Sequence, residues 1–184
     1  MKPAFALLLL SLTPAWCQLA KPAALTGSNI SAPKAGRIPA QAIGELERAF
    51  NDRLVSMADV NERVDLLGDT RGVQLEDYGV VFTAEVSLVI TPGLMPGRPK
   101  IPPEMAARVH KLRVERMPLL KTTMKEMMAI MAASLTQIPA SQRIVLVVRL
   151  YYGAWEDTTG MPAQVIMRAD RASAAAGKVE TEER

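Results

Sequence analysis

The chain has 184 residues, 49% of them hydrophobic and 4% aromatic, with 22 basic and 19 acidic side chains. The formal net charge of +3 argues against a nucleic-acid partner, because proteins that bind nucleic acid neutralise phosphates with a strongly basic surface. Cys17 is the one cysteine, so no internal disulfide can form and the hydrophobic core must supply the stability.

Residues 1–17 have the pattern of a secretory signal peptide. Lys2 supplies a positive charge, and an apolar run follows and ends before Pro14. The run is shorter than the roughly 20 apolar residues of a membrane-spanning helix. We therefore predict an exported protein, periplasmic or secreted, without a transmembrane segment in the mature chain. Lipid anchoring through Cys17 is a minority alternative, since Trp16 is larger than the residue that normally precedes a lipidated cysteine.

Two further stretches have no hydrophobic periodicity. Residues 18–39 are rich in Ala, Pro, Gly and Ser, and residues 171–184 are similarly unpatterned. We predict a disordered linker and a disordered tail, because such sequences bury little apolar surface. Between them, residues 40–170 are long enough for one domain with a single core.

The first predicted element is a helix that follows Pro39 and ends at Gly68. A helix ending near Met57, followed by a short second piece over residues 58–67, remains an alternative. Both versions keep the same apolar stripe at steps of three and four, formed by Ile43, Leu46, Phe50, Leu54, Met57, Val60, Val64 and Leu67.

A strongly alternating segment comes next. Apolar residues occupy every even position from Tyr78 to Ile90, whereas Val73 and Leu75 occupy odd ones. A one-residue slip moves every side chain of a strand to the other face, so Glu76-Asp77 must be a bulge or a tight turn. The pattern predicts a strand with one buried face, with Phe82 and Val86 in the core and Glu85 in solvent.

A second helix is predicted from about Glu104 to Gln137, after a Pro-rich connection. Pro118 should kink this helix; if it instead makes a true turn, the segment is a helical hairpin. Arg116 interrupts the apolar stripe, which consists of Met105, Val109, Leu112, Leu120, Met124, Met127, Met131 and Leu135.

Residues 143–152 and 164–168 read as two further strands. The second helix is long enough to carry the chain back along the first strand, which would make residues 143–152 parallel to it through a right-handed crossover. The expected fold is a two-layer α+β domain: a small mixed sheet packed against two long helices, with a βαβ crossover.

Motifs that carry chemistry are weak. His110 lies in a basic helix flank that also contains Arg108, Lys111, Arg113, Arg116, Lys121 and Lys125, a pattern typical of a solvated face. We find no GxSxG, HExxH, phosphate-loop or EF-hand pattern. The acidic pairs Glu76-Asp77 and Glu156-Asp157 could form a glycosidase or calcium site only by meeting across a cleft. We assign no catalytic residue, no metal ligand and no cofactor.

Methionines recur on the second helix at Met124, Met127, Met128 and Met131. Thioethers can bind Cu(I), but three of these residues share the apolar stripe, so core packing is the ordinary interpretation.

The sequence "YYGAWEDTTGMP" is the favoured binding surface. With a parallel crossover, this loop and the Pro-rich loop leave the same edge of the sheet, beyond the carboxyl ends of their strands. An edge lined by aromatic and proline residues favours binding over catalysis. The candidate binding residues are Tyr152, Trp155, Glu156, Asp157, Pro92, Met95 and Pro96.

The segments "YGVVFTAEVSL", "RVHKLR", "RIVLVVRLYYGAWEDTTG" and "PAQVIMRAD" resemble a group of uncharacterised exported bacterial proteins, over about residues 73–170. This resemblance implies export and one shared domain; it carries no known activity, so it transfers no catalytic residue to this chain. We expect a non-enzymatic module that binds or assembles with an envelope protein or an anionic envelope polymer. The alternative is a periplasmic enzyme or a metal-handling protein using Cu(I).

Overall fold

The computed structural model describes residues 36–57, 63–91 and 101–184, all of which belong to one compact unit. The predicted signal peptide and most of the predicted linker lie outside these ranges. The α+β class is confirmed by helices and a mixed sheet. In chain order the elements are α1 (Ala40–Ser56), β1 (Asp65–Leu66), β2 (Arg71–Leu75), β3 (Gly79–Ser87), α2 (Pro103–Ser134), β4 (Arg143–Leu150), β5 (Gln164–Asp170), α3 (Arg171–Ala175) and β6 (Glu180–Glu183).

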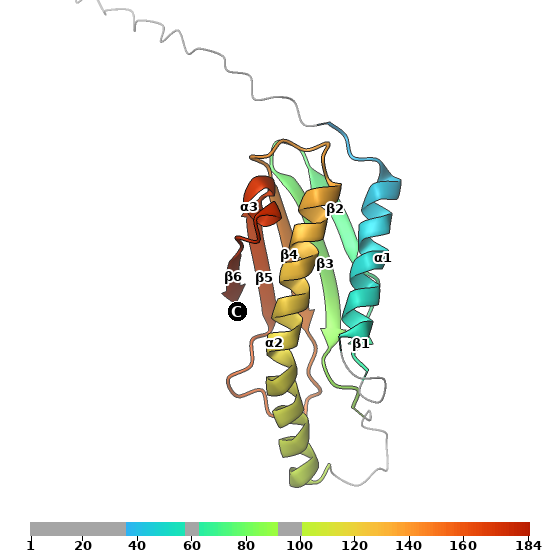
Figure 1. Cartoon of the computed structure of the whole chain (residues 1–184). Helices are drawn as coiled ribbons and strands as arrows, with labels where there is room; N and C mark the ends of the chain where they lie inside the picture. Colours follow the sequence, from blue (N-terminus) through green and yellow to red (C-terminus); the bar gives the residue numbers. More distant parts are fainter. Residues whose placement is uncertain (1–35, 58–62, 92–100) are drawn as a thin grey trace, which may run out of the picture. The chain divides into compact units, whose positions relative to one another are not determined.

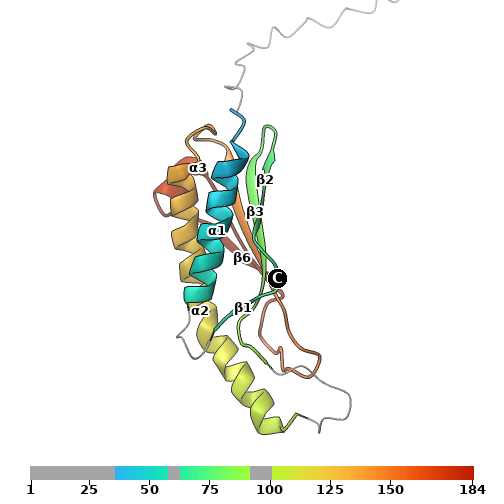
Figure 2. The ribbon, with the colours of Figure 1, turned by 90° about the vertical axis from the view of Figure 1, so that its right-hand side faces the viewer.

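The sheet contains the predicted crossover. Strands β3 and β4 are parallel neighbours joined through α2, β5 and β6 extend the sheet in antiparallel fashion, and β1 and β2 both pair with the other edge of β3. Helices α1 and α2 lie on one face of the sheet (Figures 1 and 2). Within the described part of the chain, no helix covers the opposite face. None of the described helices has the length and apolar character needed to cross a membrane.

The expected tight turn between Leu75 and Gly79 is confirmed. Asp77 has a φ of 57°, and the amide of Tyr78 donates to the carbonyl of Leu75 at 3.3 Å. Gly79 has a φ of 137°, and a Cβ placed there would lie 1.8 Å from the carbonyl oxygen of Arg143. Only glycine therefore lets β3 begin directly against β4.

The alternation in β3 also takes the predicted register. Val80, Phe82 and Val86 are fully buried, whereas Glu85 is exposed. The predicted strand was too long at both ends. Strand β3 runs only from Gly79 to Ser87, and Tyr78 and Ile90, which lie outside it, are 42% and 58% exposed.

Helix α1 is shorter than the preferred prediction. It ends at Ser56 and buries Leu46, Phe50 and Leu54, as in the alternative that stopped near Met57. Residues 58–62 of the alternative second piece lie outside the described residues, and Asp65–Leu66 form strand β1. Asn51 joins α1 to the start of β2, since its side-chain oxygen accepts hydrogen bonds from the amide and the hydroxyl of Thr70.

Helix α2 is a single helix with Pro118 inside it, so the helical-hairpin alternative is wrong. Figure 2 shows that the helix bends along its length, as expected where proline removes a backbone hydrogen bond. Three methionines of the predicted apolar stripe, Met124, Met127 and Met131, are fully buried in the core, and so is Met128 beside them.

The C-terminal residues are ordered, so the prediction of a disordered tail over residues 171–184 is wrong. Asp170 caps α3 by accepting hydrogen bonds from the amide and hydroxyl of Ser173 at 2.8 Å and 2.9 Å. Strand β6 then pairs with β5 over Glu180–Glu183. A partner strand, rather than its own composition, makes this acidic segment a strand.

Candidate binding site

The site lies beyond the carboxyl ends of the parallel strands β3 and β4, the edge at which ligands gather in sheets of this kind. The loop from β4 to β5, residues 151–163, is termed the β4–β5 loop here. The first half of α2 extends past the ends of the strands and lies beside it (Figures 1 and 2). Nδ1 of His110 on α2 is 3.0 Å from the carbonyl oxygen of Asp157 in this loop.

A buried ion pair joins the loop to α2. The side chains of Arg113 and Glu156 are 0% and 1% exposed. Nη2 of Arg113 donates to Oε1 of Glu156 at 2.9 Å, and Nε lies 2.5 Å from Oε2. Nη2 also donates to the hydroxyl of Ser87, at the end of β3, at 3.2 Å. Two opposite charges are thus withdrawn from water together, and their attraction offsets part of the cost of burying them.

The Glu156 carboxylate also organises the loop itself. Its Oε1 accepts a hydrogen bond from the amide of Gly153 at 2.9 Å, and the hydroxyl of Thr91 lies 3.5 Å away. A Cβ at Gly153 would lie 3.0 Å from Nε1 of Trp155 and 3.1 Å from Oε1 of Glu156. Both side chains therefore fold back over Gly153, and a larger residue there would push against them.

Tyr152 also belongs to the cluster, through contact of its ring with Arg113. Its ring centroid is 4.9 Å from the guanidinium carbon of Arg113, within the range of a cation–π contact. Its hydroxyl donates to the carbonyl of Pro162 at 2.7 Å, which joins the two ends of the loop. Burial raises the pKa of Tyr152 to about 12; Arg113 acts in the lowering direction and Glu156 in the raising direction.

The other predicted loop residues differ in exposure. Trp155 is partly buried and packs against the core. Asp157 is exposed, and hydrogen bonds from Thr159, with a smaller contribution from His110, hold its pKa below the usual value. The structure thus brings Tyr152, Trp155 and Glu156 together, with Asp157 beside them. Pro92, Met95 and Pro96 lie outside the described residues.

The prediction of a solvated basic flank on α2 is wrong for two residues. Arg113 is fully buried, and Arg116 is 5% exposed with Nη1 donating to the carbonyl of Leu88. Both share the buried stripe with Val109, Met117 and Leu120. One signal in the sequence could have revealed the burial of these residues: Arg116 interrupts the apolar stripe. A charged residue on a stripe that faces the core implies a buried partner.

The two acidic pairs do not meet. Glu76 and Asp77 lie in the turn before β3, whereas Glu156 and Asp157 lie beyond the end of β4. Because β3 and β4 are parallel, the pairs are at opposite ends of the sheet. A joint glycosidase or calcium site is therefore excluded. In the described ranges, no three His, Cys, Asp or Glu side chains are arranged to hold a metal ion.

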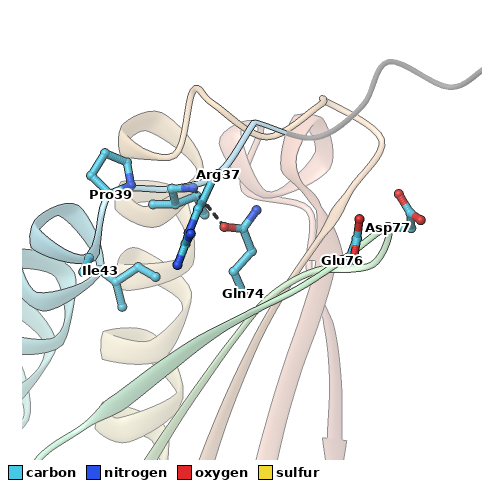
Figure 3. Close-up of a pocket in the computed structure, with 8 residues that line it drawn as sticks. Arg37, Pro39, Ile43, Gln74, Glu76 and Asp77 are labelled. Atoms are coloured by element: carbon cyan, nitrogen blue, oxygen red, sulfur yellow. Dashed lines mark hydrogen bonds between the residues drawn. The ribbon is translucent and has the colours of Figure 1, made fainter.

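A cavity of about 730 Å³ at the other end of the sheet lies between the start of α1 and the β2–β3 turn. The side-chain amide of Gln74 already has two partners there. Its Nε2 donates to the carbonyl of Gly36 at 3.0 Å, and its Oε1 accepts from the backbone amide of Ile38 at 2.9 Å. Figure 3 shows the carboxylates of Glu76 and Asp77 apart from this group. The polar side chains do not converge, so the β4–β5 loop remains the better candidate.

Comparison with known proteins found no matching family model, curated protein or solved structure.

Proposed function

We propose that the protein is an exported, non-enzymatic module that binds or assembles with an envelope component through the β4–β5 loop. The supporting observation is the buried contact of Glu156 with Arg113 and with the amide of Gly153. A loop held in one conformation before binding loses little entropy when a partner docks, and this preorganisation favours affinity.

The chemistry of the cluster supports binding over catalysis. Arg113 and Glu156 neutralise each other and are closed to solvent, whereas a catalytic group must reach its substrate. His110 faces a backbone carbonyl rather than a nucleophile.

Apolar groups are available on the surface of this end of the sheet. Tyr151 directly follows β4 and is 52% exposed, and Ile90 follows β3 and is 58% exposed. Exposed aromatic and aliphatic side chains on a rigid support are suitable anchors for a protein partner, because few well-packed residues dominate interface energies. An envelope protein is therefore favoured over an anionic polymer as the partner of this loop.

The metal-handling alternative has weaker support. Met124, Met127, Met128 and Met131 are fully buried among other core side chains. Cu(I) would have to enter the hydrophobic core to reach their sulfur atoms, and this requires the core to open.

The test compares three variants of the mature chain in pull-downs from envelope extract. Tyr151→Ala and Trp155→Ala should each weaken the recovered interaction by about 2 kcal/mol, roughly 30-fold. Leu119→Ala is the matched control, because Leu119 is a similarly exposed apolar residue, at 48%, on α2.

Unfolding midpoints separate binding from stability. Trp155 packs against the core, so its replacement can act through the fold, whereas Tyr151 is exposed and its replacement should leave the midpoint unchanged. If Tyr151→Ala and a folded Trp155→Ala variant both retain the partner as Leu119→Ala does, the loop is not the binding surface.

A further inference from the structure

A second concave region lies at the opposite end of β4 from the β4–β5 loop. It is a groove of about 460 Å³ where β4 begins, bordered by the C-terminal end of β5 and the segment between α3 and β6. Its charged and hydroxyl-bearing lining comes from separate elements and includes Ser141, Arg143, Arg168, Asp170, Lys178 and Glu180.

The strand register places several of these charges on one face of the sheet. Arg143 pairs with Asp170 across β4 and β5, and Arg168 pairs with Glu180 across β5 and β6. Directly paired residues share a face, and side chains two residues apart on one strand do as well. All four therefore lie on the face opposite α1 and α2, since the alternate residues Ile144 and Met167 are in the core.

The acidic residues of the groove already have partners. Both carboxylate oxygens of Asp170 accept hydrogen bonds from Ser173. Glu180 accepts a hydrogen bond from Nε of Arg168 at 3.0 Å. Among the described residues, Arg143 and Lys178 are exposed and make neither a side-chain hydrogen bond nor an ion pair. The groove thus retains two unpaired cations beside the hydroxyl of Ser141.

We propose that this groove binds a small oxyanion, the phosphate or carboxylate group of a ligand, through Arg143 and Lys178. A guanidinium presents paired N–H donors that match the two oxygens of either group, and an ammonium adds a compact positive charge. A cation would instead be repelled by the positive side chains of Arg143 and Lys178, which make no ion pair. The site is separate from the β4–β5 loop and does not depend on the function proposed for it.

The experiment titrates the mature chain with inorganic phosphate and, separately, with succinate at constant ionic strength, and follows the shifts of backbone amide resonances. Saturable shifts should appear near residues 141–143 and 178. Arg143→Gln and Lys178→Gln should each weaken binding about tenfold or more, because each removes a hydrogen bond to a charged group. Saturation by phosphate alone would identify a phosphate ligand, and saturation by succinate alone a carboxylate.

Arg149→Gln is the matched control. Arg149 is exposed on the same face of β4 as Arg143 and does not line the groove. Its replacement by Gln removes one positive charge, as Arg143→Gln does. This variant should bind the anion as the unmodified chain does. Equal weakening by Arg143→Gln and Arg149→Gln would show a general charge effect and overturn the proposal, as would the absence of saturable shifts with both anions.

Discussion

The contact between Arg113 and Glu156 shows how single residues define this site. A buried ion pair is a weak source of net stability, because desolvation offsets most of the attraction between the charges. Its contribution here is conformational. The two side chains connect α2, the end of β3 and the β4–β5 loop, so another loop conformation would leave a charge buried without its partner.

We expect Glu156→Gln to lower the free energy of unfolding by about 3–5 kcal/mol, because the charge of Arg113 would stay buried and unpaired. Denaturant unfolding measures the change. Asp157→Asn is the neighbouring control and should have little effect, since Asp157 is exposed.

A second substitution tests the same interpretation. Arg113→Met combined with Glu156→Gln should cost less than the sum of the two single changes, because no unpaired charge remains. A loss of under about 1 kcal/mol for Glu156→Gln alone would contradict a clamping role, since a broken buried pair costs several times more.

At the scale of elements, the register of strand β3 can be tested with one substitution on each of its two faces. Phe82→Ala should lower the free energy of unfolding by about 3–5 kcal/mol, because it leaves a cavity in the core, where Phe82 is fully buried. Glu85→Ala should change it little, since Glu85 points to solvent. Thermal or denaturant unfolding of the two variants gives the comparison. Similar losses for both would contradict the register.

The elements that the sequence predicted have a strong hydrophobic periodicity within their own residues. Strand β3 alternates, α2 repeats at steps of three and four, and their lengths together indicated the parallel crossover to β4. Strands β1 and β6 lack such a signal. The first has two residues and the second consists of three glutamates and a threonine, so only pairing with β3 and β5 makes them strands.

The site was predictable in part for the same reason. The aromatic composition of residues 151–155 and the crossover placed the β4–β5 loop at the edge of the sheet. Arg113 was missed because its partner Glu156 is 43 residues away in the chain, and a charged residue on a helix is usually solvated. Only the folded chain shows that these two charges meet.

At the scale of the whole molecule, the C-terminal segment closes one edge of the sheet and also supports the candidate binding site. Glu183 makes an ion pair with Lys121 of α2. The carbonyl of Arg184 accepts hydrogen bonds from the amides of Ala163 and Gln164, where the β4–β5 loop ends. A segment predicted to be disordered thus fixes the far end of the loop whose near end follows β4.

Removal of residues 180–184 should therefore lower the free energy of unfolding by about 2 kcal/mol or more, because several backbone hydrogen bonds worth about 1 kcal/mol each are lost. It should also promote association at high protein concentration, since β5 would become an unpaired edge carrying Val165, Ile166 and Met167. Unfolding curves and light scattering measure the two effects.

Glu180→Gln combined with Glu182→Gln is the control: it keeps the strand and removes only ion pairs with exposed partners, which contribute little. If the shortened chain matches the full chain in both measurements, β6 does not protect this edge; if the double variant matches the shortened chain, the charges of β6 rather than its backbone pairing provide the protection.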